Sequence, residues 1–288
     1  MNYLMFVYIS AIWGSSFILM KWASLSYPPM SLASYRLLSA AAILFIFWIL
    51  GERKKLFLFK DLRHISMLSL CTILPYAIQP YLIDEYGSGF IGMMVIFVPL
   101  LTILTCIVLL SQKPKKREVI GVIGGLVFAM MIIEDGLDRK FTLLNVILAF
   151  SIPFFYALGN VYIKKYLNHM KPLNLSFSIM LISGLILWPV SIYMEDIHVN
   201  EHFNSATLNL LILGIMGTGI PIIFFFSLIK NQGPLFAGMV TYVIPIGAIG
   251  WGVYDGEKTS LLQLVSISGL LFMVALVQWP VKANSSDG

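Results

Sequence analysis

The sequence predicts an all-α, polytopic integral membrane protein with ten transmembrane helices, arranged as two inverted five-helix repeats. Three observations lead to this prediction: the composition, the length of the apolar runs, and an internal repeat. Of the 288 residues, 59% are hydrophobic and only 11% are charged, whereas a soluble domain carries about 25% charged residues. So few charges cannot cover a soluble globule, and the high hydrophobicity also excludes a disordered chain.

Ten apolar runs are candidates to cross a bilayer, which takes about 20 mainly apolar residues per helix. In chain order they are residues 3–22, 30–50, 64–83, 88–111, 119–134, 141–163, 174–194, 207–229, 235–254 and 260–280. These runs do not alternate polar and apolar residues, as the strands of a transmembrane β-barrel would. The connections between them are short, so no soluble domain is expected.

Lysine and arginine residues set the expected orientation, because they are enriched in cytoplasmic loops. Most of the 19 are expected on one side of the membrane. They lie in the connections at 51–63, 112–118 and 164–173 and at positions Lys230 and Lys282. We therefore expect a multi-pass protein of the inner (cytoplasmic) membrane with both termini in the cytoplasm. The net charge of +5 is a consequence of this topology, so no nucleic-acid partner is expected.

The two halves of the chain correspond at a nearly constant offset of 143 to 146 residues. The matching pairs are Trp13–Lys21 with Tyr156–Lys164, Pro75 with Pro221, Pro99 with Pro245, Ser111-Gln112 with Gly256-Glu257, and Gly124 with Gly269. We expect a first repeat at 3–135, a second at 141–280 and a cytoplasmic tail at 281–288. Five spans is an odd number, so the second repeat enters the membrane in the opposite sense, as in many secondary transporters.

Several motifs resemble the EamA-type transporters of the drug/metabolite transporter superfamily. They are Ala11–Phe17 with Lys21, Pro28-Pro29, Ala33–Arg36, Phe97–Pro99, Val243–Pro245 and Gly256-Glu257. Ser111-Gln112 departs from the Gly-Glu junction of the family. The resemblance implies a central cavity lined mainly by helices 1, 3, 4, 6, 8 and 9, with helices 5 and 10 at the periphery. It also implies transport of small organic metabolites, often amino acids and frequently outward.

Arg36 is the one strong charge inside a predicted span, and a charge at membrane depth is a functional candidate. It would meet a substrate carboxylate; the alternatives are snorkelling to the outer surface or capping of helix carbonyls. Polar and aromatic residues of other spans would complete the site, although ordinary interhelical packing also uses them. The predicted substrate-binding residues are Trp13, Ser16, Arg36, Tyr76, Gln79, Phe97, Tyr156, Asn160 and Tyr242.

Prolines inside the spans predict bends, because proline removes a backbone hydrogen bond from a helix. The symmetric pairs Pro75/Pro221 and Pro99/Pro245 are candidate hinges or cavity-shaping bends, and the alternative is a fixed kink that shapes packing. Gly121-x-x-x-Gly125 permits close helix approach. This motif fits either an internal packing face or a homodimer contact.

The predicted function is a secondary transporter that moves small organic metabolites by alternating access through a central cavity. Export of amino acids or related compounds is favoured; the alternatives are an uptake carrier or a carrier of nucleotide-like solutes. A membrane-embedded enzyme is disfavoured, because the spans lack an acid–base pair, nucleophile or metal-binding group within mutual reach. We expect no cofactor and no metal. The expected partners are a small-molecule substrate and the lipid bilayer, with a homodimer as an open alternative.

Overall fold

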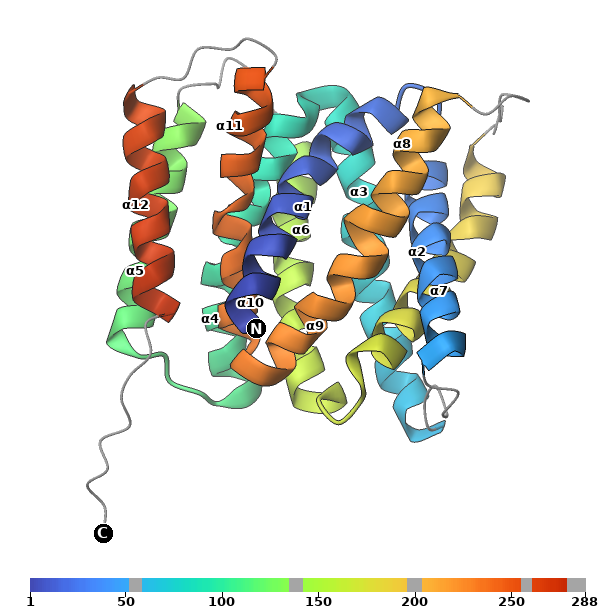
Figure 1. The fold of residues 1–288 in the computed structure, drawn as a ribbon, viewed down its shortest axis with the longest axis horizontal. Coiled ribbons are helices and arrows are strands. Elements are labelled where there is room, and N and C mark those ends of the chain that lie inside the picture. The colour runs from blue at the N-terminus through green and yellow to red at the C-terminus, as the bar shows by residue number, and fades with distance from the viewer. Residues whose placement is uncertain (52–58, 135–141, 196–203, 255–260, 279–288) are drawn as a thin grey trace.

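The helices of the computed structural model stand side by side in one bundle (Figure 1). The structure describes residues 1–51, 59–134, 142–195, 204–254 and 261–278. The elements in chain order are α1 (Asn2–Ala23), α2 (Pro29–Gly51), α3 (Phe59–Met94), η1 (Val95–Phe97), α4 (Val98–Leu110), α5 (Lys116–Glu134), α6 (Leu143–Tyr162), η2 (Ile163–Leu167), α7 (Pro172–Met194), α8 (Ser205–Gly214), η3 (Ile215–Gly219), α9 (Ile220–Gln232), α10 (Pro234–Gly238), η4 (Met239–Tyr242), α11 (Ile244–Tyr254) and α12 (Leu261–Gln278).

These elements form the ten predicted membrane helices, several of which contain an irregular turn. The eighth crossing consists of α8, the π-helical turn η3 and α9. The ninth consists of α10, the 3-10 turn η4 and α11. Six stretches are long and apolar enough to span a bilayer as single helices: Asn2–Ala23, Pro29–Gly51, Asp61–Tyr86, Leu143–Leu167, Pro172–Met194 and Ser205–Gln232. The all-helical membrane architecture is therefore confirmed.

The boundary between the third and fourth crossings differs from the prediction. The sequence suggested a connection at 84–87, but helical hydrogen bonding continues in α3 to Met94. In Figure 1 the chain runs in one direction along α3 and returns along α4. The chain thus reverses its direction within the helical segment α3, and the 3-10 segment η1 follows.

Equivalent helices of the two halves pack against each other, α2 with α7 and α5 with α12. In the second pair, a Cβ atom added at Gly124 of α5 would lie 2.7 Å from the Sδ atom of Met273 in α12. A Cβ atom added at Gly269 of α12 would likewise lie 2.5 Å from ring atoms of Phe128 in α5. The two glycines and the two large residues are each 145 positions apart. This reciprocal contact is the geometry of a two-fold axis between inverted repeats.

The Gly121-x-x-x-Gly125 motif lies in the interior of this arrangement. Gly121 faces Val277 of α12, and Gly125 faces the ring of Tyr242. The motif therefore serves internal packing, the first of the two alternatives that the sequence left open. It does not provide a surface for a homodimer.

The first and the last described residues of the chain lie on the same side of the bundle. The Tyr3 hydroxyl donates a hydrogen bond to the carbonyl of Gln278, with an O···O distance of 3.2 Å. The basic connection between α4 and α5 lies beside them, because Lys115 lines one pocket with Tyr3 and Gln278. This agrees with the sidedness expected from the basic residues.

Candidate substrate-binding cavity

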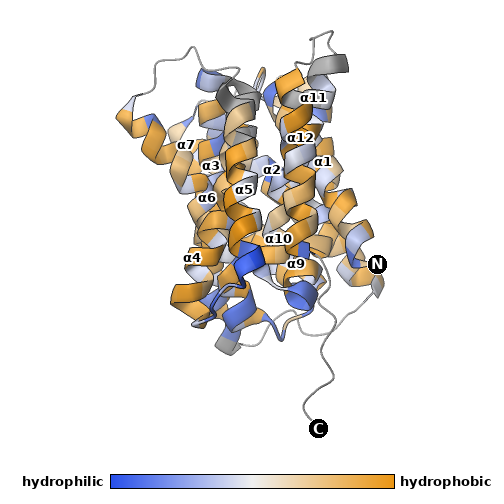
Figure 2. Cartoon of the chain, turned by 90° about the vertical axis from the view of Figure 1, so that its left-hand side faces the viewer, coloured by the Kyte–Doolittle hydropathy of each residue, from blue (hydrophilic) through white to orange (hydrophobic). Residues whose placement is uncertain are grey.

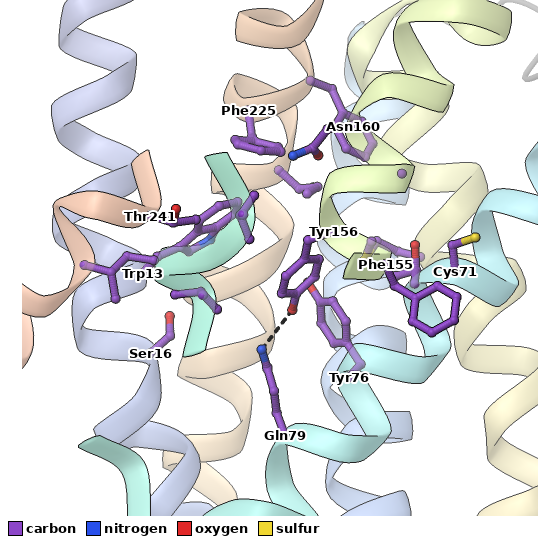
Figure 3. Close-up of a pocket in the computed structure, with 18 of the residues that line it drawn as sticks. Trp13, Ser16, Cys71, Tyr76, Gln79, Phe155, Tyr156, Asn160, Phe225 and Thr241 are labelled. Carbon is purple, nitrogen blue, oxygen red and sulfur yellow. Dashed lines mark hydrogen bonds between the residues drawn. The ribbon is translucent and has the colours of Figure 1, made fainter. Parts of the chain in front are cut away.

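A cavity with a volume of about 100 Å³ lies in the middle of the bundle (Figure 3). Its walls come from both halves: α1, α3, η1, α4, α6, η2, α9, η4 and α11, with one residue each from α2 and α7. The volume exceeds the ~30 Å³ that one water occupies in the liquid, so a small solute has room. Helices α5 and α12 contribute none of the residues that line it.

Seven of the nine predicted substrate-binding residues line this cavity. They are Trp13, Ser16, Arg36, Tyr76, Gln79, Tyr156 and Asn160. Figure 3 shows six of them, all except Arg36, around the same space. Residues that lie more than 140 positions apart in the chain are therefore neighbours here.

Arg36 points into the bundle from α2 and is only 5% exposed. Its Nε donates a hydrogen bond to Thr218 Oγ1 at 2.8 Å. Its guanidinium carbon lies 4.5 Å from the centroid of the Tyr76 ring, a distance at which a cation is attracted by the aromatic face. The alternative of snorkelling to the outer surface is thereby excluded.

Thr218 is a site residue that the sequence analysis missed. It lies in the π-helical turn η3, and its hydroxyl donates to the carbonyl of Leu213, five residues earlier, at 3.0 Å. A Cβ on the neighbouring Gly219 would lie 3.2 Å from the Cα of Ala40, so η3 approaches α2 closely at this point. The detectable signal was a polar residue between two glycines, three positions before Pro221.

None of the described residues that line the cavity is an aspartate or a glutamate, so no carboxylate among them balances the charge of Arg36. Its Nη1 atom is buried and has no hydrogen-bond partner in the described part of the chain. A buried cation in this state is costly unless an anion pairs with it. The cavity is therefore electrostatically suited to an anionic group.

The remaining cavity wall combines amide and aromatic groups. Gln79 of α3 donates from Nε2 to the Tyr156 hydroxyl of α6 at 3.0 Å (Figure 3). The ring of Trp13 lies against that of Phe225, with centroids 4.8 Å apart. Asn160 is almost fully buried at the same cavity. Apolar and aromatic walls with a few placed polar groups are typical of small-molecule sites.

Two predicted site residues, Tyr242 and Phe97, do not line the cavity. The Tyr242 hydroxyl donates to the carbonyl of Val122 in α5 at 2.6 Å. Successive residues of the 3-10 turn η4 point to different sides, so Thr241 reaches the cavity in its place. The Phe97 ring packs on Phe150 of α6, with centroids 4.8 Å apart.

The four predicted hinge prolines lie near the cavity but are not among its lining residues. Pro99 and Pro245 follow equivalent 3-10 segments, η1 and η4. Pro221 follows the π-helical turn η3, whereas Pro75 lies inside the continuous helix α3. Irregular backbone thus accompanies three of these prolines, including both members of the pair Pro99/Pro245.

Comparisons with known proteins agree with this architecture. A model of the EamA-like transporter family matches residues 1–134 and 143–279. The uncharacterized inner membrane transporter YedA of Escherichia coli strain K12 is 26% identical over 273 residues, which cover 92% of this chain and 87% of YedA. The uncharacterized transporter YoaV of Bacillus subtilis strain 168 is 23% identical and covers 85% of each chain. A crystal structure shares the fold, with a TM-score of 0.78 at 14% identity over 96% of both chains.

Proposed function

Since this chain belongs to the EamA-like transporter family, we propose that it exports amino acids or related small carboxylates across the cytoplasmic membrane. Transport proceeds by alternating access through the central cavity. The chain is a membrane transporter, not an enzyme, and the proposal adds the cargo and the direction. In this proposal both termini lie in the cytoplasm, the repeats span 3–135 and 141–280, and 281–288 form the tail.

The observation that carries the cargo assignment is the unbalanced charge of Arg36. Its Nη1 has no partner in the described part of the chain, while Thr218 fixes its Nε. A guanidinium held in this way presents its free edge to a carboxylate, with which it forms short, charge-assisted hydrogen bonds. Arg36 would bind the carboxylate, and Tyr76 would hold the guanidinium from its other side.

The remaining cavity residues would contact the rest of the cargo. Gln79, Asn160 and Ser16 offer hydrogen-bonding groups, and Trp13 and Tyr156 offer aromatic surfaces. The volume of about 100 Å³ gives a small carboxylate room beside these groups. The prolines after η1 and η4 are proposed hinges, since irregular backbone at equivalent places lets the two halves exchange conformations.

A counterflow experiment tests the cargo. The purified protein is reconstituted in lipid vesicles loaded with one unlabelled amino acid or organic acid, and uptake of the labelled solute is followed. We expect saturable counterflow for at least one carboxylate-bearing solute. If none of the amino acids or organic acids exchanges, while the protein is folded and correctly inserted, the proposed cargo is wrong.

Charge removal tests the role of Arg36 in the same assay. Arg36→Gln should weaken transport at low substrate concentration by about thirtyfold or more, since losing one partner of a buried charge pair costs about 2 kcal/mol or more. The matched control is Lys21→Gln, which removes an exposed positive charge at the end of α1. Equal effects of the two variants would contradict a carboxylate contact at Arg36.

A further inference from the structure

A second pocket, with a volume of about 350 Å³, lies on the side of the bundle that holds Tyr3 and Gln278. It is formed where the connection between α4 and α5 meets the start of α1, the end of α9, the start of α10 and the end of α12. It shares none of its lining residues with the central cavity. The transport cycle proposed above gives it no role.

The charge of this pocket is positive. Lys113, Lys115 and Arg117 line it, and Glu118 is the only acidic residue among the described residues that line it. The Glu118 carboxylate already accepts a hydrogen bond from the backbone N–H of Lys115 at 2.8 Å. It is therefore held at the start of α5, and Lys113 and Lys115 alone outnumber it.

Amide groups add further hydrogen-bond donors. Gln112, Gln232 and Gln278 line the same pocket. The Nε2 atom of Gln278 is buried and has no hydrogen-bond partner among the described residues. Cationic and amide donors around one space are suited to the oxygens of a phosphate group.

The pocket lies at the level where lipid headgroups would meet the helices. Figure 2 shows a strongly hydrophilic segment at the start of α5, directly beside the apolar part of the same helix. Val108 of α4 is 77% exposed and Ile120 of α5 is 57% exposed, each within one turn of a pocket residue. A lipid whose headgroup occupies the pocket would thus find apolar helix surface for its acyl chains.

We propose that this pocket binds the phosphate-bearing headgroup of an anionic membrane phospholipid. Basic pockets between transmembrane helices at the cytoplasmic face are suited to such headgroups. Lys113 and Lys115 supply the charge, and Gln278 supplies a donor to a phosphate oxygen. The site is independent of the cargo and would tie the α5–α12 pair to the surrounding lipid.

Native mass spectrometry of the full-length protein in detergent tests this proposal. The probes are phosphatidylglycerol, phosphatidylcholine with the same acyl chains, and inorganic phosphate. We expect retention of one phosphatidylglycerol per chain, with at least tenfold weaker retention of phosphatidylcholine. Lys113→Gln/Lys115→Gln should weaken phosphatidylglycerol binding about twenty-five-fold, because each basic residue near an anionic lipid contributes about 1 kcal/mol, or about fivefold.

The matched control is Lys116→Gln/Lys165→Gln. It also removes two exposed lysines, neither of which lines the pocket, and its lipid binding should equal that of the unmodified protein. Monodisperse elution and an unchanged circular dichroism spectrum establish that both variants fold. If the control loses as much binding as the pocket variant, or if phosphatidylcholine binds as well as phosphatidylglycerol, the proposal is wrong. If inorganic phosphate prevents lipid retention at millimolar concentration, the site binds soluble phosphate, and the lipid assignment is overturned.

Discussion

The third and eighth crossings occupy equivalent places in the two halves, yet they differ in chemistry. Thr72 in α3 and Thr218 in η3 are 146 residues apart, as are Pro75 and Pro221. Thr72 donates to the carbonyl of Leu68, four residues earlier, as expected in a regular α-helix. Thr218 donates to a carbonyl five residues earlier and accepts from Arg36.

The helices α2 and α7, which also occupy equivalent places in the two halves, differ in the same way. The residue that α2 contributes to the cavity is Arg36, whereas α7 contributes Met180. The two halves therefore share a scaffold but not a binding chemistry. Pseudo-symmetry sets the shape of the cavity, and local departures from it, a π-helical turn and one charge, decide what the cavity can hold.

The largest expected effect concerns the symmetric part of the scaffold. Gly124→Val and Gly269→Val should each lower the free energy of unfolding by about 2–3 kcal/mol, since overpacking has costs of this size. Thermal unfolding in detergent measures both. The control Gly250→Val is at a position where an added Cβ meets no atom within 4 Å. The loss at Gly269 should be at least as large as that at Gly124, because the Phe128 ring is rigid and the Met273 side chain can shift. Stability losses no larger than that of the control at both glycines would contradict the reciprocal contact between α5 and α12.

A somewhat smaller effect is expected for the asymmetric part. Thr218→Val should raise the KM of the transported carboxylate about tenfold, because the hydrogen bond that orients Arg36 is lost and such a bond to a charged group contributes about 1.5 kcal/mol. Thr72→Val is the matched variant in the other half and should leave KM within about twofold. The measurement is concentration-dependent counterflow. A larger effect at Thr72 would reverse the comparison.

The smallest expected effect concerns the prolines after η1 and η4. Pro99→Ala and Pro245→Ala should each slow the maximal transport rate a few-fold with little change in KM, because they restore a backbone donor at a bend. Both should act alike, since they occupy equivalent positions. Normal transport rates in both variants would show that these prolines are fixed bends and not hinges.

Hydropathy and charge were sufficient to predict the ten crossings, because the bilayer constrains both strongly. Arg36 was predictable for the same reason, since an intramembrane charge stands out. The inverted repeat was predictable from the residue pairs at a nearly constant offset. Thr218 was not predictable, because its contact with Arg36 depends on the π-helical turn η3. Such a turn holds one residue more than an α-helical turn, and this insertion leaves no clear periodicity in the sequence. The position of Tyr242 outside the cavity lining was not predictable either. Adjacent residues of a 3-10 turn face different neighbours, and only the packing against α5 decides between them.

The unbalanced charge of Arg36 also links the proposed transport cycle to the membrane voltage. A carrier loaded with a singly charged carboxylate would hold a neutral pair in its cavity, whereas the empty carrier would hold one net positive charge. One elementary charge that crosses the whole field gains about 2.3 kcal/mol per 100 mV. A membrane that is negative inside would then favour the inward return of the empty carrier, so that the electrical potential itself would drive export of an anionic cargo.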